Sequence, residues 1–458
     1  MDVTRANFRD LLPVIHQKID ECSFVAVDTE FTGLCGGPDQ EYSLFDTPAK
    51  RYVKLRKSVQ QFIVCQLGIT TFTNDHWKNQ YTATSFNFYL FPRSFDNIDE
   101  RFSVQTSSFE FLCDHHFDFN KFAYDGIPYL SCEQEASIRQ KRQTSFKDAQ
   151  AQQACEEQLT EACGFLLVFK HLMQAKKPLL GHNMFMDLLF LYDKFYKPLP
   201  VSYDTFKEDI HDLFPVLIDT KHIANQVKRE LSHPGGDLVR NTGLDALHTN
   251  LTSKACDNTA AMFPSIHLDT ESSRYEEAQF HEAGYDSFVA GVVLIRMCHL
   301  LARQSMAVED RATTSWAKIC KLIEGHINLI NVIRGSVQYL SITGPDPSSC
   351  RPTWLELTSR SFLGKLTRDE VVECLEQYDK LDYELQGSNR CIIAAEHAES
   401  ARRLHNDFAD HPLFQLSEYQ PSTSPLVYVG FGGAALLAGA AAVYYLKPDY
   451  LARLQSLM

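Results

Sequence analysis

The sequence predicts an α/β fold in which buried strands end in acidic residues and apolar helices flank a mixed sheet. Three observations lead to this class. Phe24 to Val27 is an uninterrupted apolar run, as expected of a buried strand. Residues 62–72 and 85–91 are rich in β-forming residues and are expected beside it as antiparallel neighbours. Met184 to Phe195 and Phe288 to Leu301 are longer apolar stretches, which predict helices that cover the sheet.

The first strand carries two acids at its C-terminal end, in the run SFVAVDTEFTG. Asp28 and Glu30 are two residues apart, so their side chains leave the same face of an extended backbone. Both could therefore reach one cation. The alternative for such a pair, taken alone, is a solvated strand end.

A third acid lies near the start of an apolar helix. Leu179-Leu180 is predicted to end a strand, and Gly181-His182-Asn183 to form a turn before the helix. Asp187 is the lone acid in the first turns of that helix. Its structural alternative is a capped or paired carboxylate.

The run HEAGYDSFV contributes a histidine and a fourth acid. His281 and Asp286 are five residues apart, which would place them about 140° apart on a continuous helix. We therefore expect an irregular turn at Gly284 and a helix that starts near Asp286. Both side chains can then face one cavity.

These five residues suit phosphodiester hydrolysis by two Mg²⁺ ions about 3.5–4 Å apart, with Mn²⁺ as a substitute. Asp28, Glu30 and Asp286 are assigned to the ion that activates water, and Asp28 with Asp187 to the ion beside the leaving group. His281 titrates near neutrality and is assigned as the base. The joint occurrence of these motifs in this order is hard to obtain by chance, which favours catalysis over the structural alternatives.

The chain resembles the DEDDh exonucleases, and among them the poly(A)-specific ribonuclease family. The resemblance rests on long runs that span most of residues 1–300: SFVAVDTEFTG, FDTPAKRYVKLRK, SFNFYLFPRSF, FDFNK, GIPYL, GHNM, FPVLIDTK and HEAGYD. It implies a ribonuclease H-like core and shortening of RNA from a free 3′ end. It also implies that Asp28, Glu30, Asp187 and Asp286 are metal ligands and that His281 is the base.

The same resemblance suggests contacts to single-stranded RNA. The residues concerned are Phe31, Leu34, Phe111, Asn183, Lys221 and Leu244. Phe31 or Phe111 could stack on a base at about 1–3 kcal/mol, while Lys221 could meet a phosphate oxygen. Core packing is the alternative for Phe111 and Leu244.

Charge and cysteine content permit this function without indicating it. The net charge is −14, whereas phosphate binding relies on Lys and Arg. The basic segment 50–57 could guide an RNA backbone, with a solvated helix face as the alternative.

The 13 cysteines form no CxxC pair, so reduced thiols in the cytosol are expected. His115 and His116 near Cys113 are interpreted as loop or surface residues, and MDVTRANFRD lacks the apolar region of a signal peptide.

The chain is expected to contain an exonuclease domain over residues 1–335, with a polar excursion at 133–160. Poly(A)-specific ribonucleases carry an inserted RNA-binding domain about there, for which this chain has no room. Residues 336–412 resemble the family's degenerate RNA-recognition-like α+β domain, in the order β-β-α-β-β-α. Its run NRCIIAAE offers no aromatic residue for base stacking, which favours packing or partner binding.

After a linker at 413–425, residues 426–446 are 21 residues without a charge, enough to cross a layer of about 30 Å. Tyrosines flank this stretch and Lys447 follows it, before a short tail at 447–458. We expect a transmembrane tail anchor with the nuclease in the cytosol, on the mitochondrial outer membrane or alternatively the endoplasmic reticulum. A stripe of small residues in this stretch, Gly430, Ala434, Ala438 and Ala442, permits close helix contact and suggests dimerisation as a secondary hypothesis.

The combination is similar to the ribonuclease-like trimmers of this family that shorten PIWI-bound piRNA precursors in the germline. That resemblance implies a PIWI protein carrying the RNA and a Tudor-domain adaptor as partners. The expected activity is 3′→5′ exoribonuclease trimming that releases 5′-mononucleotides. The alternatives are a membrane-bound poly(A) deadenylase and, from another class, an inactive RNA-binding membrane scaffold.

Overall fold

The computed structural model describes residues 1–142, 149–230, 238–254, 256, 263–305, 315–349, 351–361 and 365–420. The chain divides into two compact units, Met1–Arg351 and Pro352–Met458. The predicted span at 426–446 and its flanking tail lie outside the described residues.

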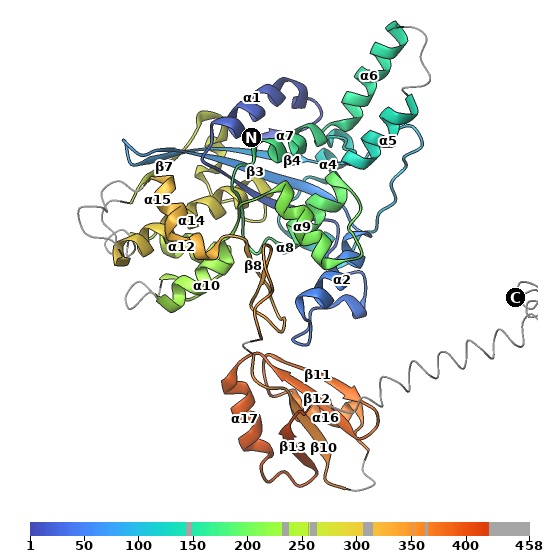
Figure 1. The fold of residues 1–458 in the computed structure, drawn as a ribbon, viewed down its shortest axis with the longest axis vertical. Helices are drawn as coiled ribbons and strands as arrows, with labels where there is room; N and C mark the ends of the chain where they lie inside the picture. The colour runs from blue at the N-terminus through green and yellow to red at the C-terminus, as the bar shows by residue number, and fades with distance from the viewer. Residues whose placement is uncertain are drawn as a thin grey trace, which may run out of the picture. The chain divides into compact units, whose positions relative to one another are not determined.

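The first unit is built on one mixed sheet (Figure 1). Its strands are β1 (Asp2–Val3), β2 (Phe24–Phe31), β3 (Val64–Asp75), β4 (Gln80–Tyr89), β5 (Leu179–Gly181), β6 (Leu217–Asp219) and β7 (Ser265–Leu268). The order is β1-β4-β3-β2-β5-β6, with β7 also on β4. β2, β3 and β4 are antiparallel, while β5 and β6 run parallel to β2. The expected antiparallel arrangement is therefore confirmed in a mixed α/β, ribonuclease H-like fold, although only β3 lies beside the first strand and β4 pairs with β3.

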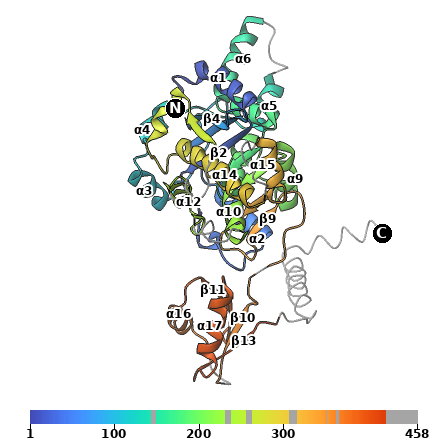
Figure 2. The same ribbon diagram turned by 90° about the vertical axis from the view of Figure 1, so that its left-hand side faces the viewer.

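Helices cover both faces of this sheet (Figures 1 and 2). They are α1 (Phe8–Glu21), α2 (Pro48–Val59), α3 (Thr106–Asp114), α4 (Phe119–Asp125), α7 (Leu166–Ala175), α8 (Phe185–Leu191), α9 (Tyr203–Leu213), α10 (Thr220–Glu230), α12 (Leu244–Leu251), α14 (Ala283–Ser305) and α15 (Trp316–Leu322). A π-helical turn, η2 (Tyr192–Tyr196), continues α8. Short 3₁₀ turns lie at Pro38–Gln40, Thr270–Glu276 and Glu324–His326.

The apolar strand β2 divides the core into two clusters because successive side chains point to opposite faces. Val25 and Val27 pack with the side of α1, α7 and α8. Phe24 and Ala26 pack with the side of α14. Both faces of this strand are thus buried, as its uninterrupted apolar run predicts.

The long helix α14 is a core helix. Residues Ala283–Ala302 are long and apolar enough to cross a membrane, but 94% of their most apolar window is buried inside the structure. The helix packs on β2, β3 and β4. Its burial in the sheet core accounts for its composition.

The polar excursion at 133–160 contains two helices, α5 (Cys132–Arg142) and α6 (Ala149–Cys163). Both project from the sheet in Figure 1. Arg139 of α5 bonds to Glu156 of α6 at 2.7 Å, which ties the two helices together.

The boundary between the units lies later than expected. Tyr339–Ser341 forms β9, which pairs with β8 (Leu329–Asn331) inside the first unit. The first strand expected in the small domain therefore belongs to the nuclease unit, which ends at Arg351.

The second unit has the order β-α-β-β-α-β. Its elements are β10 (Leu355–Ser359), α16 (Arg368–Leu375), β11 (Leu381–Gln386), β12 (Arg390–Ala395), α17 (Ala398–Phe408) and β13 (Phe414–Glu418). The sheet order is β11-β12-β10-β13, and every pair is antiparallel. The closing strand β13 was not expected from the sequence.

Candidate active site

Three predicted acids meet where β2 approaches the start of α14. The ligand oxygens of Asp28, Glu30 and Asp286 all lie within 4.8 Å of one another. We call these three residues the carboxylate cluster. Asp28 and Glu30 lie two residues apart near the C-terminal end of β2, as expected, and Asp286 lies in the first turn of α14.

The start of α14 is docked on the strands that face the acids. The Ala283 N–H donates to Gln66 Oε1 at 2.9 Å, and the Gly284 N–H donates to Asn87 Oδ1 at 3.1 Å. Gln66 is the register partner of Glu30 on β3. The side-chain oxygens of Gln66 and Asn87 thus accept from backbone N–H groups that a helix start leaves without partners. These bonds hold the start of α14, and with it Asp286, beside β2.

Burial and mutual repulsion act on this cluster. Asp28 and Glu30 keep part of their surface exposed, but protein atoms surround both carboxylates closely. The resulting desolvation raises the pKa of both well above the usual range. The nearby carboxylates, Asp286 first, raise the pKa further. Burial also raises the pKa of Asp286 to about 7. Concentrated carboxylates that resist ionisation indicate a place where a positive charge is needed.

The donor set fits a hard divalent cation. Asp286 Oδ1 is buried and has no hydrogen-bond partner among the described residues. Buried polar atoms are rarely left unpaired, and an orphaned carboxylate oxygen beside two further carboxylates is the usual environment of such a cation. The cluster matches the three residues predicted to hold the ion that activates water.

Asp187 lies apart from this three-residue group but influences it. It is buried on α8, and its Oδ1 accepts a hydrogen bond from the Thr29 hydroxyl. Burial raises the pKa of Asp187 to about 6, although the bond from Thr29 acts in the opposite direction. Its charge raises the pKa of Asp28. Its predicted role at the second ion stays a prediction.

His281 approaches the cluster through its backbone. Its N–H donates to Asp286 Oδ2 at 3.0 Å, and its φ is +70°. The irregular residue before the helix is therefore His281 and not Gly284, which lies inside α14 packed against Tyr275 and Asn87. The helix begins three residues before Asp286, at Ala283. The exposed imidazole lies against α3, where Phe111 and His115 contact it.

Sequence reasoning missed Asp219, the fully buried last residue of β6. Its carboxylate accepts N–H bonds from five residues; the donors are Asn183, Met184, Lys221, His222 and Asn331, at 2.9–3.2 Å. The sequence signal for Asp219 was its place directly after the apolar residues Leu217 and Ile218. Asp219 thereby joins the turn before α8 to the start of α10.

Two predicted substrate residues belong to this arrangement. Asn183 has a φ of +61°, and its Oδ1 accepts from Asn331 Nδ2 at 2.8 Å. The Lys221 ammonium donates to the Thr242 carbonyl at 3.3 Å, and burial lowers its pKa. Asp219 fixes the backbone of both residues.

The other predicted substrate residues differ in exposure. Leu34 is 47% exposed and Phe111 is 41% exposed, so neither is a core residue. Phe31 stacks on Phe190, with ring centroids 4.1 Å apart. Leu244 packs against the core cluster around α14, which agrees with its alternative as a packing residue.

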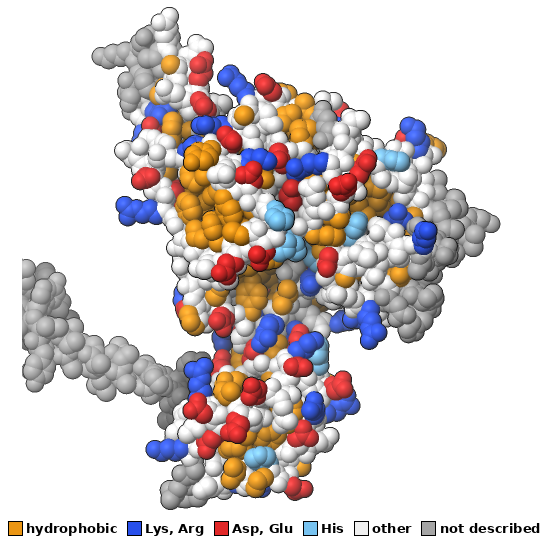
Figure 3. Space-filling model, turned by 180° about the vertical axis from the view of Figure 1, so that it is seen from behind, with side chains coloured by type: hydrophobic (Ala, Val, Ile, Leu, Met, Phe, Trp, Pro, Cys, Tyr) orange, Lys and Arg blue, Asp and Glu red, His pale blue; other side chains and the backbone are white. Residues whose placement is uncertain are grey.

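Three of the five cations in the basic segment 50–57 are used inside the protein. Arg51 is buried and bonds to Asp46 at 3.0 Å, and Lys54 pairs with the same carboxylate at 2.8 Å. The Arg56 guanidinium donates to the Leu199 carbonyl. On the face drawn in Figure 3, Lys and Arg side chains are likewise scattered among Asp and Glu. Lys50 and Lys57 stay exposed, so the expectation that this segment guides RNA remains a prediction that rests on these two residues.

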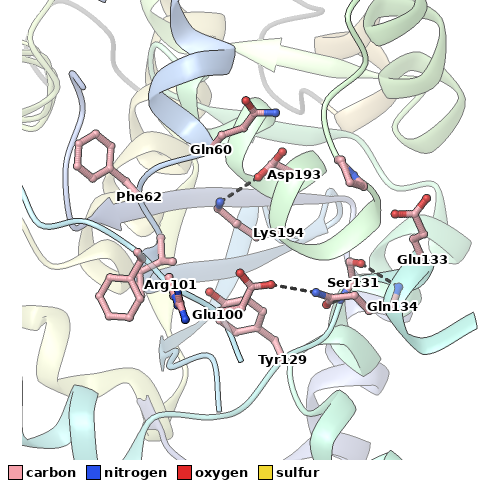
Figure 4. Close-up of a pocket in the computed structure, with 13 residues that line it drawn as sticks. Gln60, Phe62, Glu100, Arg101, Tyr129, Ser131, Glu133, Gln134, Asp193 and Lys194 are labelled. Atoms are coloured by element: carbon pink, nitrogen blue, oxygen red, sulfur yellow. Dashed lines mark hydrogen bonds and ion pairs between the residues drawn. The ribbon is translucent and has the colours of Figure 1, made fainter. Parts of the chain in front are cut away.

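A separate cavity of about 250 Å³ lies beside the π-helical turn. Figure 4 shows the Asp193–Lys194 ion pair facing Glu100, Arg101 and Tyr129 across it. None of the five predicted catalytic residues lines this cavity. The π-helical turn contributes Asp193 and Lys194 to this cavity, whereas Asp187 lies earlier, on α8.

Comparison with known proteins assigns the family. Residues 3–294 match the CAF1 family ribonuclease. The chain is 32% identical to the poly(A)-specific ribonuclease PNLDC1 of Mus musculus, with 92% of this chain and 94% of that protein covered. It is 25% identical to the pre-piRNA 3′-exonuclease trimmer of Bombyx mori, over 92% and 93% of the two chains. The poly(A)-specific ribonuclease PARN of Danio rerio is 28% identical, over 76% of this chain and 66% of that protein.

These matches agree with the enzyme class predicted from the motifs. They cover most of this chain and, for the mouse and silk-moth proteins, nearly the whole relative. The chain therefore belongs to the CAF1 family of ribonucleases, and the exoribonuclease class predicted from its sequence is confirmed.

Proposed function

We propose that this chain is a divalent-cation-dependent 3′→5′ exoribonuclease that trims the 3′ ends of PIWI-bound pre-piRNAs. The observation that carries the proposal is the match to a protein named for that activity over 92% of this chain. The carboxylate cluster supports a hydrolytic role, since its three acids lie within 4.8 Å of one another. A second supporting feature is the orphaned oxygen of Asp286.

Two Mg²⁺ ions bound here would supply an activated water and stabilise the charge on the reacting phosphate and the leaving 3′ oxygen. The protein holds Asp28, Glu30 and Asp286 on elements fixed by the sheet, and Thr29 orients Asp187. His281 lies next to Asp286 and would take the proton from the attacking water. Release of 5′-mononucleotides follows from attack at the phosphate of the last nucleotide.

The substrate in this proposal is presented by a partner. The chain carries a net charge of −14, and two cations of segment 50–57, Arg51 and Lys54, are paired with Asp46 inside the protein. A PIWI protein that holds the RNA body, with a Tudor-domain adaptor, would supply the grip that the chain lacks. The uncharged stretch 426–446 would anchor the enzyme on the mitochondrial outer membrane, with the nuclease in the cytosol.

The second candidate is a membrane-bound poly(A) deadenylase, which the names of the mouse and zebrafish relatives favour. An inactive RNA-binding scaffold is the candidate from another class. A scaffold has no need to keep three carboxylates close together in a desolvated site.

The deciding experiment compares the purified protein on three substrates: free oligo(A), free RNA of mixed sequence, and RNA loaded on PIWI. We expect shortening of PIWI-loaded RNA to a defined length, and no preference for free oligo(A) over mixed sequence. Activity confined to free oligo(A) would identify a deadenylase.

Glu30→Ala tests whether the chain is catalytic at all. Loss of one cation ligand removes several kcal/mol of transition-state stabilisation, about 10³-fold or more in turnover. The exposed Glu208→Ala is the matched control and should retain activity. Unchanged shortening by Glu30→Ala would leave the scaffold as the better description.

In cells, the same variant should leave piRNA precursors with extended 3′ ends, visible by small-RNA sequencing.

A further inference from the structure

The imidazole of His281 contacts two rings at the end of α3, Phe111 within the helix and His115 directly after it. Its centroid lies 4.0 Å from that of His115, at an interplanar angle of 64°, and 5.0 Å from that of Phe111, at 79°. Both contacts are edge-to-face, the geometry that aromatic pairs favour. On the side of the acids, the His281 backbone N–H donates to Asp286 Oδ2 at 3.0 Å. Ring and backbone are therefore fixed by different elements.

Two hydrogen bonds hold His115 to the last turn of α3. Its Nδ1 lies 2.7 Å from the Phe111 carbonyl oxygen, and because a carbonyl can only accept, the proton of the ring is on Nδ1. The His115 backbone N–H donates to the same carbonyl at 3.2 Å. The helix beneath it is anchored by the buried Leu112. His115 thus places its ring against His281, a residue that is 166 positions later in the sequence.

We propose that His115 is a positioning residue for His281. An exposed histidine can adopt several side-chain rotamers, and a base that must meet one proton loses efficiency when it is spread among them. The Asp286 bond fixes the His281 backbone, and the rings of His115 and Phe111 limit the orientations open to the imidazole on that backbone. His115 would act through His281 and would not itself touch the RNA. The inference rests on the proposed function, in which His281 is the base.

The test measures kcat and KM on a free single-stranded RNA for four proteins: wild type, His115→Ala, His115→Phe and Cys113→Ser. His115→Ala should lower kcat about 10-fold to 100-fold, the range expected for a misplaced catalytic group, with KM within about twofold. His115→Phe keeps a ring against His281 and should restore most of kcat. Cys113→Ser changes an exposed residue of the same helix and should behave as wild type.

A double-mutant cycle separates positioning from other roles. Loss of the base in His281→Ala should lower kcat by about 10²–10⁴-fold, and adding His115→Ala should cost nothing more. Full additivity of the two losses, a rise in KM as the main effect of His115→Ala, or a kcat that is unchanged or increased would each overturn the proposal. An equal loss in His115→Phe and His115→Ala would also overturn it, because the ring contact would then not be what positions His281.

Failure of the proposed function gives a different result. If wild type does not shorten RNA, or if Glu30→Ala shortens it normally, the nuclease assignment fails. If wild type is active, Glu30→Ala is inactive and the cycle is additive, the nuclease assignment stands and only the role of His115 fails. Equal melting temperatures of His115→Ala and wild type would exclude unfolding as the cause of a lower kcat.

Discussion

At the residue scale, the carboxylate cluster stores repulsion that a bound cation would remove. Asp28, Glu30 and Asp286 resist ionisation because burial and their neighbours both favour the neutral acid. A site arranged for stability alone would hold at most one of these groups without a partner. The arrangement is therefore a cost in the metal-free protein and a source of affinity for a divalent cation.

This cost predicts how stability depends on pH. Burial raises the pKa of Asp286 from its ordinary value of 3.8 to about 7, so the folded state keeps a proton that the unfolded state has lost between these values. The free energy of unfolding of the metal-free protein should fall as pH rises through that window. Denaturation in EDTA at a series of pH values from 4.5 to 8, about one pH unit apart, measures this fall.

Asp286→Asn should change the same measurement. At pH 8 in EDTA the variant should be more stable than wild type by at least about 1.4 kcal/mol, the equivalent of one pKa unit. Mg²⁺ or Mn²⁺ should stabilise wild type but not the variant, and turnover should be lost. Asp99→Asn, at an exposed site, is the control. A wild type whose stability does not respond to pH or cations would contradict the account of the cluster.

Asp219 supports the site from behind, and its removal should be costly. Asp219→Ala leaves five backbone N–H groups without their acceptor in the core, and each hydrogen bond to a charged group contributes about 1.5–3 kcal/mol. We expect a loss of at least about 3 kcal/mol in the free energy of unfolding. Chemical denaturation measures this, and a loss below that of a typical surface substitution would show that water replaces the carboxylate.

The residues of the site were predictable from sequence where spacing along one element decided the geometry. Asp28 and Glu30 leave the same face because a strand has a period of two. The Thr29 bond to Asp187 and the ring contact of His115 with His281 join residues far apart in the chain. No local period encodes such contacts, so His115 was interpreted only as a loop or surface residue.

At the element scale, the site depends on how closely α14 approaches the sheet. A Cβ added at Gly68, the register partner of Asp28, would overlap the backbone carbonyl of Ala283. The absence of a side chain at this position lets the start of the helix reach the strand that faces the acids. The distance between Asp28 and Asp286 is therefore set partly by a glycine on a third element.

Gly68→Ala should damage both stability and catalysis. Overpacking against backbone typically costs about 1–3 kcal/mol, and a displacement of the helix start by about 1 Å can cost about 100-fold in rate. Gly325→Ala is the matched control, because nothing lies within 4 Å of the added Cβ. Denaturation and turnover should both separate the two variants. A Gly68→Ala enzyme as active as the control would show that α14 can shift without effect.

The elements themselves were predicted where the apolar pattern was long. Strands β2, β3 and β4 and the helices around Asp187 and Asp286 lie where periodicity places them. Strand β9 was assigned to the wrong unit because its partner β8 lies before it, and pairing is a tertiary choice. Strand β13 is short and polar on one face, so its pattern alone was too weak to separate it from the linker.

At the scale of the whole molecule, the acidic chain is suited to RNA that arrives already held. Free RNA must be attracted by Lys and Arg, and the binding it provides depends strongly on salt. Segment 50–57 instead uses Arg51 and Lys54 to fasten Asp46 inside the protein. We therefore expect shortening of free RNA to be weak at physiological salt and much stronger when the RNA is loaded on PIWI. A comparison of rates at low and physiological salt measures this difference.

Membrane attachment is the prediction that belongs to the whole chain. Residues 426–446 are uncharged over a length that spans the hydrocarbon layer, so the full-length protein should resist extraction by alkaline carbonate. Leu436→Arg with Leu437→Arg places two charges at the centre of the stretch, at a cost of about 2.5–3.5 kcal/mol each, and should release the protein. Ala434→Leu with Ala438→Leu changes two residues in the same stretch but keeps it apolar, and this control should remain on the membrane. Turnover of free RNA in detergent should be equal in all three proteins, because the nuclease unit is unchanged. Release of all of them by carbonate would show that the stretch does not span a membrane.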